Sequence, residues 1–226
     1  MCGRFTYKLT WPEIVKLYQL TLDIPARNTQ ARYNVCPTDP IDVVLTDEDG
    51  KRNCISMRWG LIPMWWNKPI KEMKLATFNA RAETVTTKPI FRESFKRNRC
   101  LIPASGYYEW QDTPQGKQPY YFTRRDGAPV TIAGLWDRWR DRATGEHVIS
   151  ATMIITEPST FVAKMHDRMP VILEDKDFEP WLSGQAGTEL LRPASEDILQ
   201  SWPVSKRVNS SRADAGDATL IDPIKI

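Results

Sequence analysis

The second residue of the chain is a cysteine followed by a glycine. An initiator Met is generally removed when a small residue follows it, and removal of Met1 would leave Cys2 with a free α-amine beside its thiol. Such a 1,2-aminothiol does chemistry that an internal cysteine cannot. The amine, with a reference pKa of about 7.7–8.0, condenses with an aldehyde to a Schiff base, and the thiol then closes a thiazolidine ring. Position alone leaves open the alternative that Cys2 is an ordinary residue at a frayed end.

Glu109 is a candidate for proton transfer because it lies among aromatic residues in the run Gly106-Tyr107-Tyr108-Glu109-Trp110. A carboxylate in such surroundings is either paired or functional. Desolvation by the neighbouring rings favours the neutral form, which suits the group to move protons to and from an amine. The alternative is a structural ion pair with one of the many arginines.

The chain has only two histidines, His147 and His166. His147 follows the Thr144-Gly145 turn and begins an apolar strand, so we expect it at the surface. His166, with a reference pKa of about 6.5, can exchange a proton near neutral pH. A lone histidine is more often structural than catalytic, and the residue type alone does not decide between the two.

Three arginines and a pair of tryptophans have the chemistry to bind a nucleic acid. A guanidinium can hold a phosphate oxygen pair bidentately, and Arg4, Arg81 and Arg168 could serve in this way. Trp65-Trp66 offers flat surface for an unpaired base, worth about 1–3 kcal/mol per base. Burial in the core is the alternative, but neighbours on a strand point to opposite faces, so at most one should be buried if this stretch is extended.

The elements that position these residues are mostly strands. Short turns at 47–50, 114–116 and 126–127 separate runs rich in β-branched and aromatic residues, which predicts antiparallel hairpins over about 32–135. A capping box at Thr10-Trp11-Pro12-Glu13 predicts a helix near 11–21, and Pro89 begins another around 89–97. The last third combines a strand from His147 to Thr156 with helices near 159–165, 175–183 and, more weakly, 195–201. We expect 138–142 to be a solvated hairpin loop, with DNA contact the alternative.

Composition excludes several classes of protein. With 226 residues, 41% hydrophobic and 26% charged, the chain is typical of one globular domain. No apolar run approaches the roughly 18 residues of a membrane span, and the N-terminus has no secretory signal, so we expect a cytosolic protein. The sequence lacks dinucleotide-binding, Walker, hydrolase-elbow and zincin motifs. The net charge of +3 permits an anionic partner without requiring one.

The spacing of the four cysteines does not indicate a metal site, because no C-x-x-C pair exists and only two histidines are present to assist. We expect Cys36, Cys54 and Cys100 to be small buried hydrophobic residues.

Six blocks of the sequence occur in one order that closely resembles the SOS-response-associated peptidase (SRAP) family, the abasic-site shielding proteins. The resemblance covers residues 2 to about 208. Its blocks are MCGRF (1–5), RYNV (32–35), WGLIP (59–63) with Trp65-Trp66, NARAET (79–84), RCLIP (99–103) through GYYEW (106–110), and HDRMP (166–170).

The resemblance implies a single α+β domain over residues 2–226, predominantly antiparallel β and barrel-like, with short peripheral helices. It also implies covalent capture of abasic sites in single-stranded DNA through Cys2. Asn79 would hold the N-terminal amine and the sugar, Glu109 would transfer protons, and His166 would protonate the ring oxygen as the sugar opens. The stretch after about residue 208 carries no recognised motif.

The same resemblance places Arg4, Asn34, Arg81 and Arg168 against the DNA, together with Trp65 and Trp66. It implies no metal and no organic cofactor. We expect a monomer that is cytoplasmic and becomes nucleoid-associated when bound to damaged DNA.

Two other functions remain open at this stage. One is a cysteine peptidase, for which the only certain cleavage is the autoproteolytic release of Met1. The other is a non-covalent single-strand binding module, against which the low charge of +3 counts.

Overall fold

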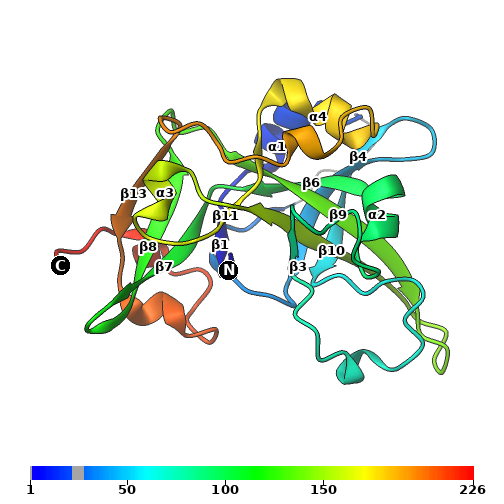
Figure 1. Cartoon of the computed structure of the whole chain (residues 1–226), viewed down its shortest axis with the longest axis horizontal. Helices are drawn as coiled ribbons and strands as arrows, with labels where there is room; N and C mark the ends of the chain where they lie inside the picture. The colour runs from blue at the N-terminus through cyan, green and yellow to red at the C-terminus, as the bar shows by residue number, and fades with distance from the viewer. Residues whose placement is uncertain (1, 22–27) are drawn as a thin grey trace.

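The computed structural model describes residues 2–21 and 28–226, and its architecture is built from two β-sheets (Figure 1). The smaller sheet has the order β13-β8-β7-β1-β2. Its strands are β1 (Phe5–Tyr7), β2 (Arg32–Val35), β7 (Gly106–Thr113), β8 (Gly116–Arg124) and β13 (Leu199–Pro203). The strands of the larger sheet are β3 (Pro40–Thr46), β4 (Arg52–Trp59), β5 (Asn79–Arg81), β6 (Arg99–Ala104), β9 (Val130–Arg140), β10 (His147–Thr156), β11 (Met169–Pro170) and β12 (Ile172–Leu173).

Part of the larger sheet closes into a barrel. Its order runs β10-β4-β3-β6-β9, and β9 pairs with β10 again from Arg140↔His147 to Gly134↔Met153, which completes the ring. Every pairing is antiparallel except those of β10 with β4 and β5. The main core lies inside this barrel, where β9 and β10 contribute long buried runs. The predicted α+β, barrel-like fold is therefore confirmed.

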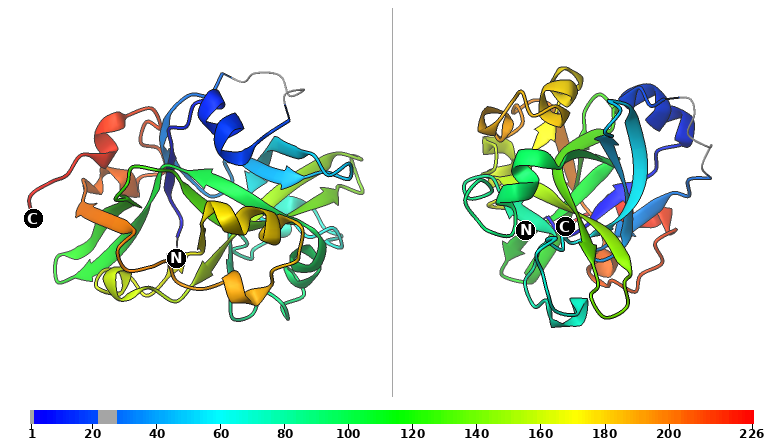
Figure 2. Two further views of the ribbon diagram at one scale, coloured as in Figure 1. Left: turned by 90° about the horizontal axis from the view of Figure 1, so that it is seen from above. Right: turned by 90° about the vertical axis from the view of Figure 1, so that its right-hand side faces the viewer.

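Short helices lie around the sheets (Figures 1 and 2): α1 (Trp11–Tyr18), α2 (Arg92–Arg97), α3 (Thr160–Ala163) and α4 (Asp175–Leu182). The predicted capping box is present, since the Glu13 carboxylate accepts from the Thr10 backbone N–H at 2.7 Å. The helix ends earlier than predicted because Gln19 takes a left-handed conformation with φ of 51°. No helix among the described residues is long and apolar enough to cross a membrane.

Two sequence predictions are wrong. The weak helix at 195–201 does not form, because Leu199–Pro203 pairs with β8 as an edge strand. The predicted solvated loop at 138–142 is wrong for its first three residues. Arg138 to Arg140 belong to β9, and Trp139 is buried. Pairing with a distant strand decides both cases, and a local pattern does not reveal such pairing.

β1 runs through the middle of the molecule and connects the N-terminus to β7 (Figures 1 and 2). Phe5 pairs with Tyr107, and the Tyr108 N–H donates to the Arg4 carbonyl at 3.1 Å. On its other side β7 approaches β8 closely at Gly106, because a Cβ there would collide with the Tyr121 hydroxyl and the Phe122 carbonyl. The pairing of β1 fixes the first residues of the chain alongside the middle of β7.

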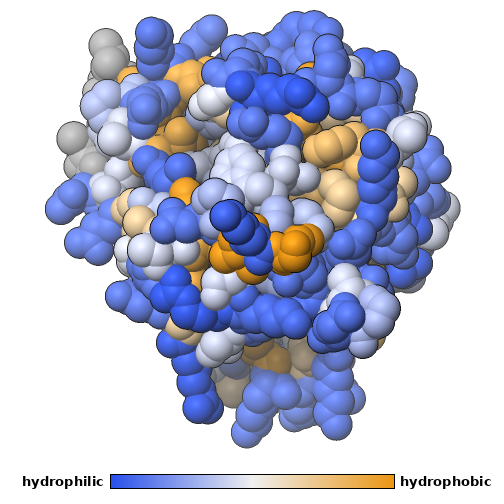
Figure 3. All heavy atoms as spheres, turned by 90° about the vertical axis from the view of Figure 1, so that its left-hand side faces the viewer, coloured by the Kyte–Doolittle hydropathy of each residue, from blue (hydrophilic) through white to orange (hydrophobic). Residues whose placement is uncertain are grey.

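The C-terminal segment, residues 204–226, packs on the outer face of the smaller sheet. Tyr108, Tyr121, Val204, Val208 and Leu220 form a second hydrophobic cluster there. The side of the molecule that carries β13 and this segment is otherwise largely hydrophilic, with small apolar patches (Figure 3). The stretch without a recognised motif is thus an ordered part of the fold.

Candidate functional site

Cys2 is buried, with 2% of its surface exposed, although it stands at the start of the chain. Asn79 holds its backbone, because the side-chain Nδ2 donates to the Cys2 carbonyl at 3.0 Å. Asn79 begins β5, and pairing with Met153 of β10 fixes its position. The Asn79 Oδ1 atom is buried and has no hydrogen-bond partner within the described residues. An acceptor therefore remains available beside Cys2.

Glu109 is fully buried on β7. Burial, with a contribution from the negative charge of Asp167, raises the pKa of Glu109 to about 7. Its Oε2 atom lies 3.4 Å from Nε2 of His166. A carboxyl group with this pKa exists in both protonation states near neutral pH, so it can act as acid or as base.

His166 lies on the loop between α3 and β11 and faces Glu109 through Nε2. Nδ1 lies 3.1 Å from the Arg168 backbone nitrogen, which can donate to it, and 3.2 Å from the Arg168 carbonyl oxygen, which can accept from it, so either tautomer of the ring has a partner. Burial lowers the pKa of His166, which favours the neutral ring at physiological pH. The contact of Nε2 with Glu109 places the two titratable groups where a proton can pass between them.

The Cys2 thiol is in an environment that opposes ionisation. Burial raises its pKa well above the ordinary value, and the negative charge of Glu109 raises it further. A cysteine peptidase needs the reverse, a nucleophile whose pKa is depressed by a nearby cation or base. The resting sulfur is therefore a protonated thiol within electrostatic reach of a carboxyl group that can remove its proton.

An open depression of about 380 Å³ gives access to this cluster. Its lining includes three residues that the sequence analysis did not single out, Trp110, Lys117 and Asn209. The Trp110 indole N–H donates to Asn209 Oδ1 at 2.6 Å, which ties the C-terminal segment to the site. Lys117 comes from β8, where the hairpin register sets it opposite Asp112. Lys117 directly follows the predicted turn at 114–116, so that turn could have indicated its position. No local pattern indicated Asn209.

The three candidate arginines differ in their surroundings. Arg4 lines the depression, and its Nε atom is buried without a hydrogen-bond partner among the residues described. Arg81 is exposed on β5. Arg168 forms an ion pair with Glu83, so a phosphate would have to compete with a carboxylate there. Arg4 and Arg81 are the more accessible cations.

Asn34 is not brought into the depression. It is 2% exposed on β2, and its Nδ2 donates to the Ser210 carbonyl of the C-terminal segment at 2.9 Å. The geometry gives Asn34 a role in attaching that segment to the sheet. Direct contact between Asn34 and DNA stays a prediction.

The two tryptophans lie on a turn and not on a strand. Trp65 is 49% exposed next to Met64, which is 68% exposed, whereas Trp66 is half-buried. The Trp139 indole N–H donates to the Trp66 carbonyl at 2.6 Å and fixes the turn to β9. On this turn the exposed apolar surface is thus mainly that of Met64 and Trp65.

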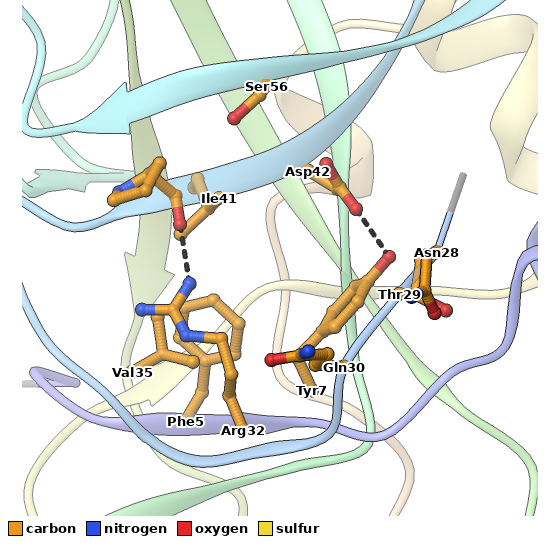
Figure 4. A pocket seen from close by; sticks show the side chains of 11 residues that line it. Phe5, Tyr7, Asn28, Thr29, Gln30, Arg32, Val35, Ile41, Asp42 and Ser56 are labelled. Carbon is orange, nitrogen blue, oxygen red and sulfur yellow. Dashed lines mark hydrogen bonds between the residues drawn. The ribbon is translucent and has the colours of Figure 1, made fainter. Parts of the chain in front are cut away.

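A second hollow, also of about 380 Å³, lies beside β1 and is lined by Tyr7, Arg32, Asp42 and other residues (Figure 4). Its principal polar groups are already engaged, since the Tyr7 hydroxyl donates to Asp42 at 2.7 Å and Arg32 donates to the Pro40 carbonyl at 2.7 Å. None of the candidate catalytic residues lines it. The depression and this second hollow are equal in volume, but only the depression is lined by candidate catalytic residues.

Across residues 2–21 and 28–226, no three His, Cys, Asp or Glu side chains come together in a way that could hold a metal ion. Cys36, Cys54 and Cys100 are buried, as predicted.

Comparison with known proteins agrees with the sequence blocks. A family model described as SOS response associated peptidase (SRAP) matches residues 1–211. The chain is 35% identical over 231 residues to the abasic site processing protein YoaM of Bacillus subtilis, with 98% of each chain covered. It is 34% identical over 221 residues to YoqW of the same organism, covering 94% of this chain and 96% of YoqW. A solved Bacteroides thetaiotaomicron protein shares the fold, with a TM-score of 0.86, 24% identity and coverage of 99% and 100%.

Proposed function

The chain belongs to the SOS response associated peptidase (SRAP) family, and on that premise we propose that it processes abasic sites in single-stranded DNA by forming a thiazolidine crosslink through Cys2. The relatives YoaM and YoqW are named abasic site processing proteins, which supports the substrate class. The observation that carries the chemistry is the position of Glu109, a fully buried carboxyl group with a pKa of about 7 beside Cys2 and His166.

The reaction begins at the α-amine that removal of Met1 exposes on Cys2. Protonated His166 gives its Nε2 proton to the ring oxygen, the anomeric hydroxyl gives its proton to the Glu109 carboxylate, and the abasic sugar opens to its aldehyde. The amine adds to the carbonyl carbon, and protonated Glu109 supplies the proton with which the hydroxyl of the carbinolamine leaves as water. The unpartnered Oδ1 of Asn79 can accept from the amine or from a sugar hydroxyl without protonating the amine.

The thiol closes the ring in the second stage. Glu109, now a carboxylate, removes the Cys2 proton, sulfur bonds to the carbon of the protonated imine, and the C=N electron pair moves to nitrogen, which becomes the neutral amine of the ring. The high thiol pKa suits this order, since sulfur reacts only after the amine has bound the substrate. A peptidase mechanism would require sulfur to attack first.

DNA would be held around the depression by the accessible cations Arg4, Arg81 and Lys117. An unpaired base can stack on Trp65, which favours a single strand over a duplex, where the bases stack on one another.

The test mixes the mature protein, verified by intact mass to lack Met1, with a single-stranded oligonucleotide carrying one abasic site. We expect a crosslink whose mass equals that of protein plus DNA minus one water. A permanent N-terminal tag should abolish it, and Cys2→Ser should give only a Schiff base that borohydride can trap. Cys36→Ser, which alters another buried thiol, is the matched control and should crosslink normally. Equal crosslinking by the tagged and mature proteins would refute the aminothiol mechanism.

A further inference from the structure

Tyr107 carries a buried polar group for which the proposed reaction has so far given no role. The residue is 1% exposed, and its hydroxyl has no hydrogen-bond partner anywhere in the described part of the chain. A buried hydroxyl without a partner lowers stability, and a phenylalanine would fill the same space without that cost. The orphan hydroxyl therefore requires an explanation.

The strand geometry places this hydroxyl on the catalytic side of β7. Successive side chains of a strand alternate between faces, so Tyr107 shares a face with Glu109, whereas Tyr108 packs into the cluster on the outer face. The Tyr107 ring is fixed by a stack on Phe122, with centroids 5.0 Å apart and planes 9° apart. Pairing of Phe5 with Tyr107 brings the N-terminal residues alongside.

The electrostatics indicate that the Tyr107 hydroxyl acts as a hydrogen-bond donor and not as a base. Burial raises the pKa of Tyr107 well above the ordinary value, and a charge on Cys2 raises it further, more than the charge on Glu109 does. The group thus remains an O–H donor at every pH at which the protein works. Glu109 already faces Nε2 of His166, whereas a sulfur that has lost its proton needs a donor.

We propose that Tyr107 is a further catalytic residue at the Cys2 site, whose hydroxyl donates a hydrogen bond to the Cys2 sulfur as that sulfur attacks the imine carbon. This inference rests on the proposed function and concerns only ring closure. The thiol proton passes to Glu109, the S–C bond forms, and the C=N pair of the protonated imine moves to nitrogen, which becomes the neutral amine of the ring. Tyr107 keeps its own proton throughout and stabilises the transient negative charge on sulfur.

The test compares Tyr107→Phe with Tyr108→Phe in the mature protein. Tyr108 is the matched control because its hydroxyl donates to the Tyr33 carbonyl at 2.7 Å on the other face of the same strand. Quenching an abasic-DNA reaction with borohydride at intervals separates the Schiff base, which is reduced, from the closed ring. For Tyr107→Phe we expect Schiff-base formation at the wild-type rate and closure slowed about 10-fold, the value of one hydrogen bond to a charged group.

Thermal stability provides a second readout that distinguishes the two roles. Tyr107→Phe should melt at or above the wild-type temperature, whereas Tyr108→Phe should melt lower and close the ring normally. Wild-type closure in Tyr107→Phe, or a loss of both steps together with a lower melting temperature, would overturn the assignment.

Alkylation of Cys2 by iodoacetamide across pH tests the contact without any DNA. The midpoint should lie higher in Tyr107→Phe than in wild type, and equal midpoints would count against the hydrogen bond. If the wild-type protein forms no crosslink at all, the proposed function fails, while this alkylation measurement still decides whether Tyr107 acts on the sulfur.

Discussion

Replacing Glu109 by glutamine should remove a pH-dependent loss of stability. The carboxyl group is fully buried, and burial raises its pKa from 4.5 to about 7. Between these two pH values the folded protein keeps the Glu109 proton while the unfolded chain releases it. Stability therefore falls as pH rises through this window and stays low above it. The pKa difference corresponds to about 3 kcal/mol.

The amide of Glu109→Gln cannot ionise, so the variant should gain about 3 kcal/mol relative to wild type between pH 4.5 and pH 8. Urea unfolding at a series of pH values measures this difference, and subtracting the two proteins cancels the titrating groups that do not interact with Glu109. Glu83→Gln is the control, and its stability difference from wild type should change little with pH and in the opposite direction. The pKa of Glu83 is lowered, because the hydrogen bond from Arg168 outweighs the opposing effect of burial. A Glu109 difference that does not change with pH would refute the assignment of a raised pKa.

Three further predictions concern the reaction and the DNA. His166→Ala should slow crosslink formation and, more severely, release onto a competitor abasic strand, and unchanged release would remove His166 from the proton path. Arg81→Ala should weaken binding to all single strands and reduce the slope of log affinity against log salt by about one, whereas the pairing of Arg168 with Glu83 should make Arg168→Ala milder. Trp65→Ala should cost about 1–3 kcal/mol of single-strand affinity with no change in that slope, and an altered slope would argue against stacking.

The sequence was informative wherever a local pattern decides the structure. The sequence predicts the strand His147–Thr156 with its observed limits, and the capping box predicts where α1 begins. Burial of Glu109 followed from the aromatic residues around it. These features depend on neighbours within a few positions of the chain, which is the range that a sequence pattern reports.

Features that depend on distant pairings could not be predicted. The parallel pairing that sets Asn79 beside β10 joins residues 74 positions apart in sequence, as its register Asn79↔Met153 shows. The ion pair of Arg168 with Glu83 spans 85 positions. Attachment of the C-terminal segment to Asn34 likewise has no local signal, and the strand pairing of 199–203 overrode a weak helical pattern. In such cases tertiary contacts override the local conformational preference of the sequence.

Burial of the Cys2 thiol bears on how long the protein survives unused in a cell. Peroxides and soluble electrophiles react with a thiolate, and they do so readily when it is exposed. Cys2 meets neither condition, because it is 2% exposed and the charge of Glu109 adds to burial in keeping its proton in place. In the proposed reaction this carboxyl group triggers ring closure. In the absence of DNA the same group would protect Cys2 from oxidation, because it helps to keep the sulfur in its protonated form.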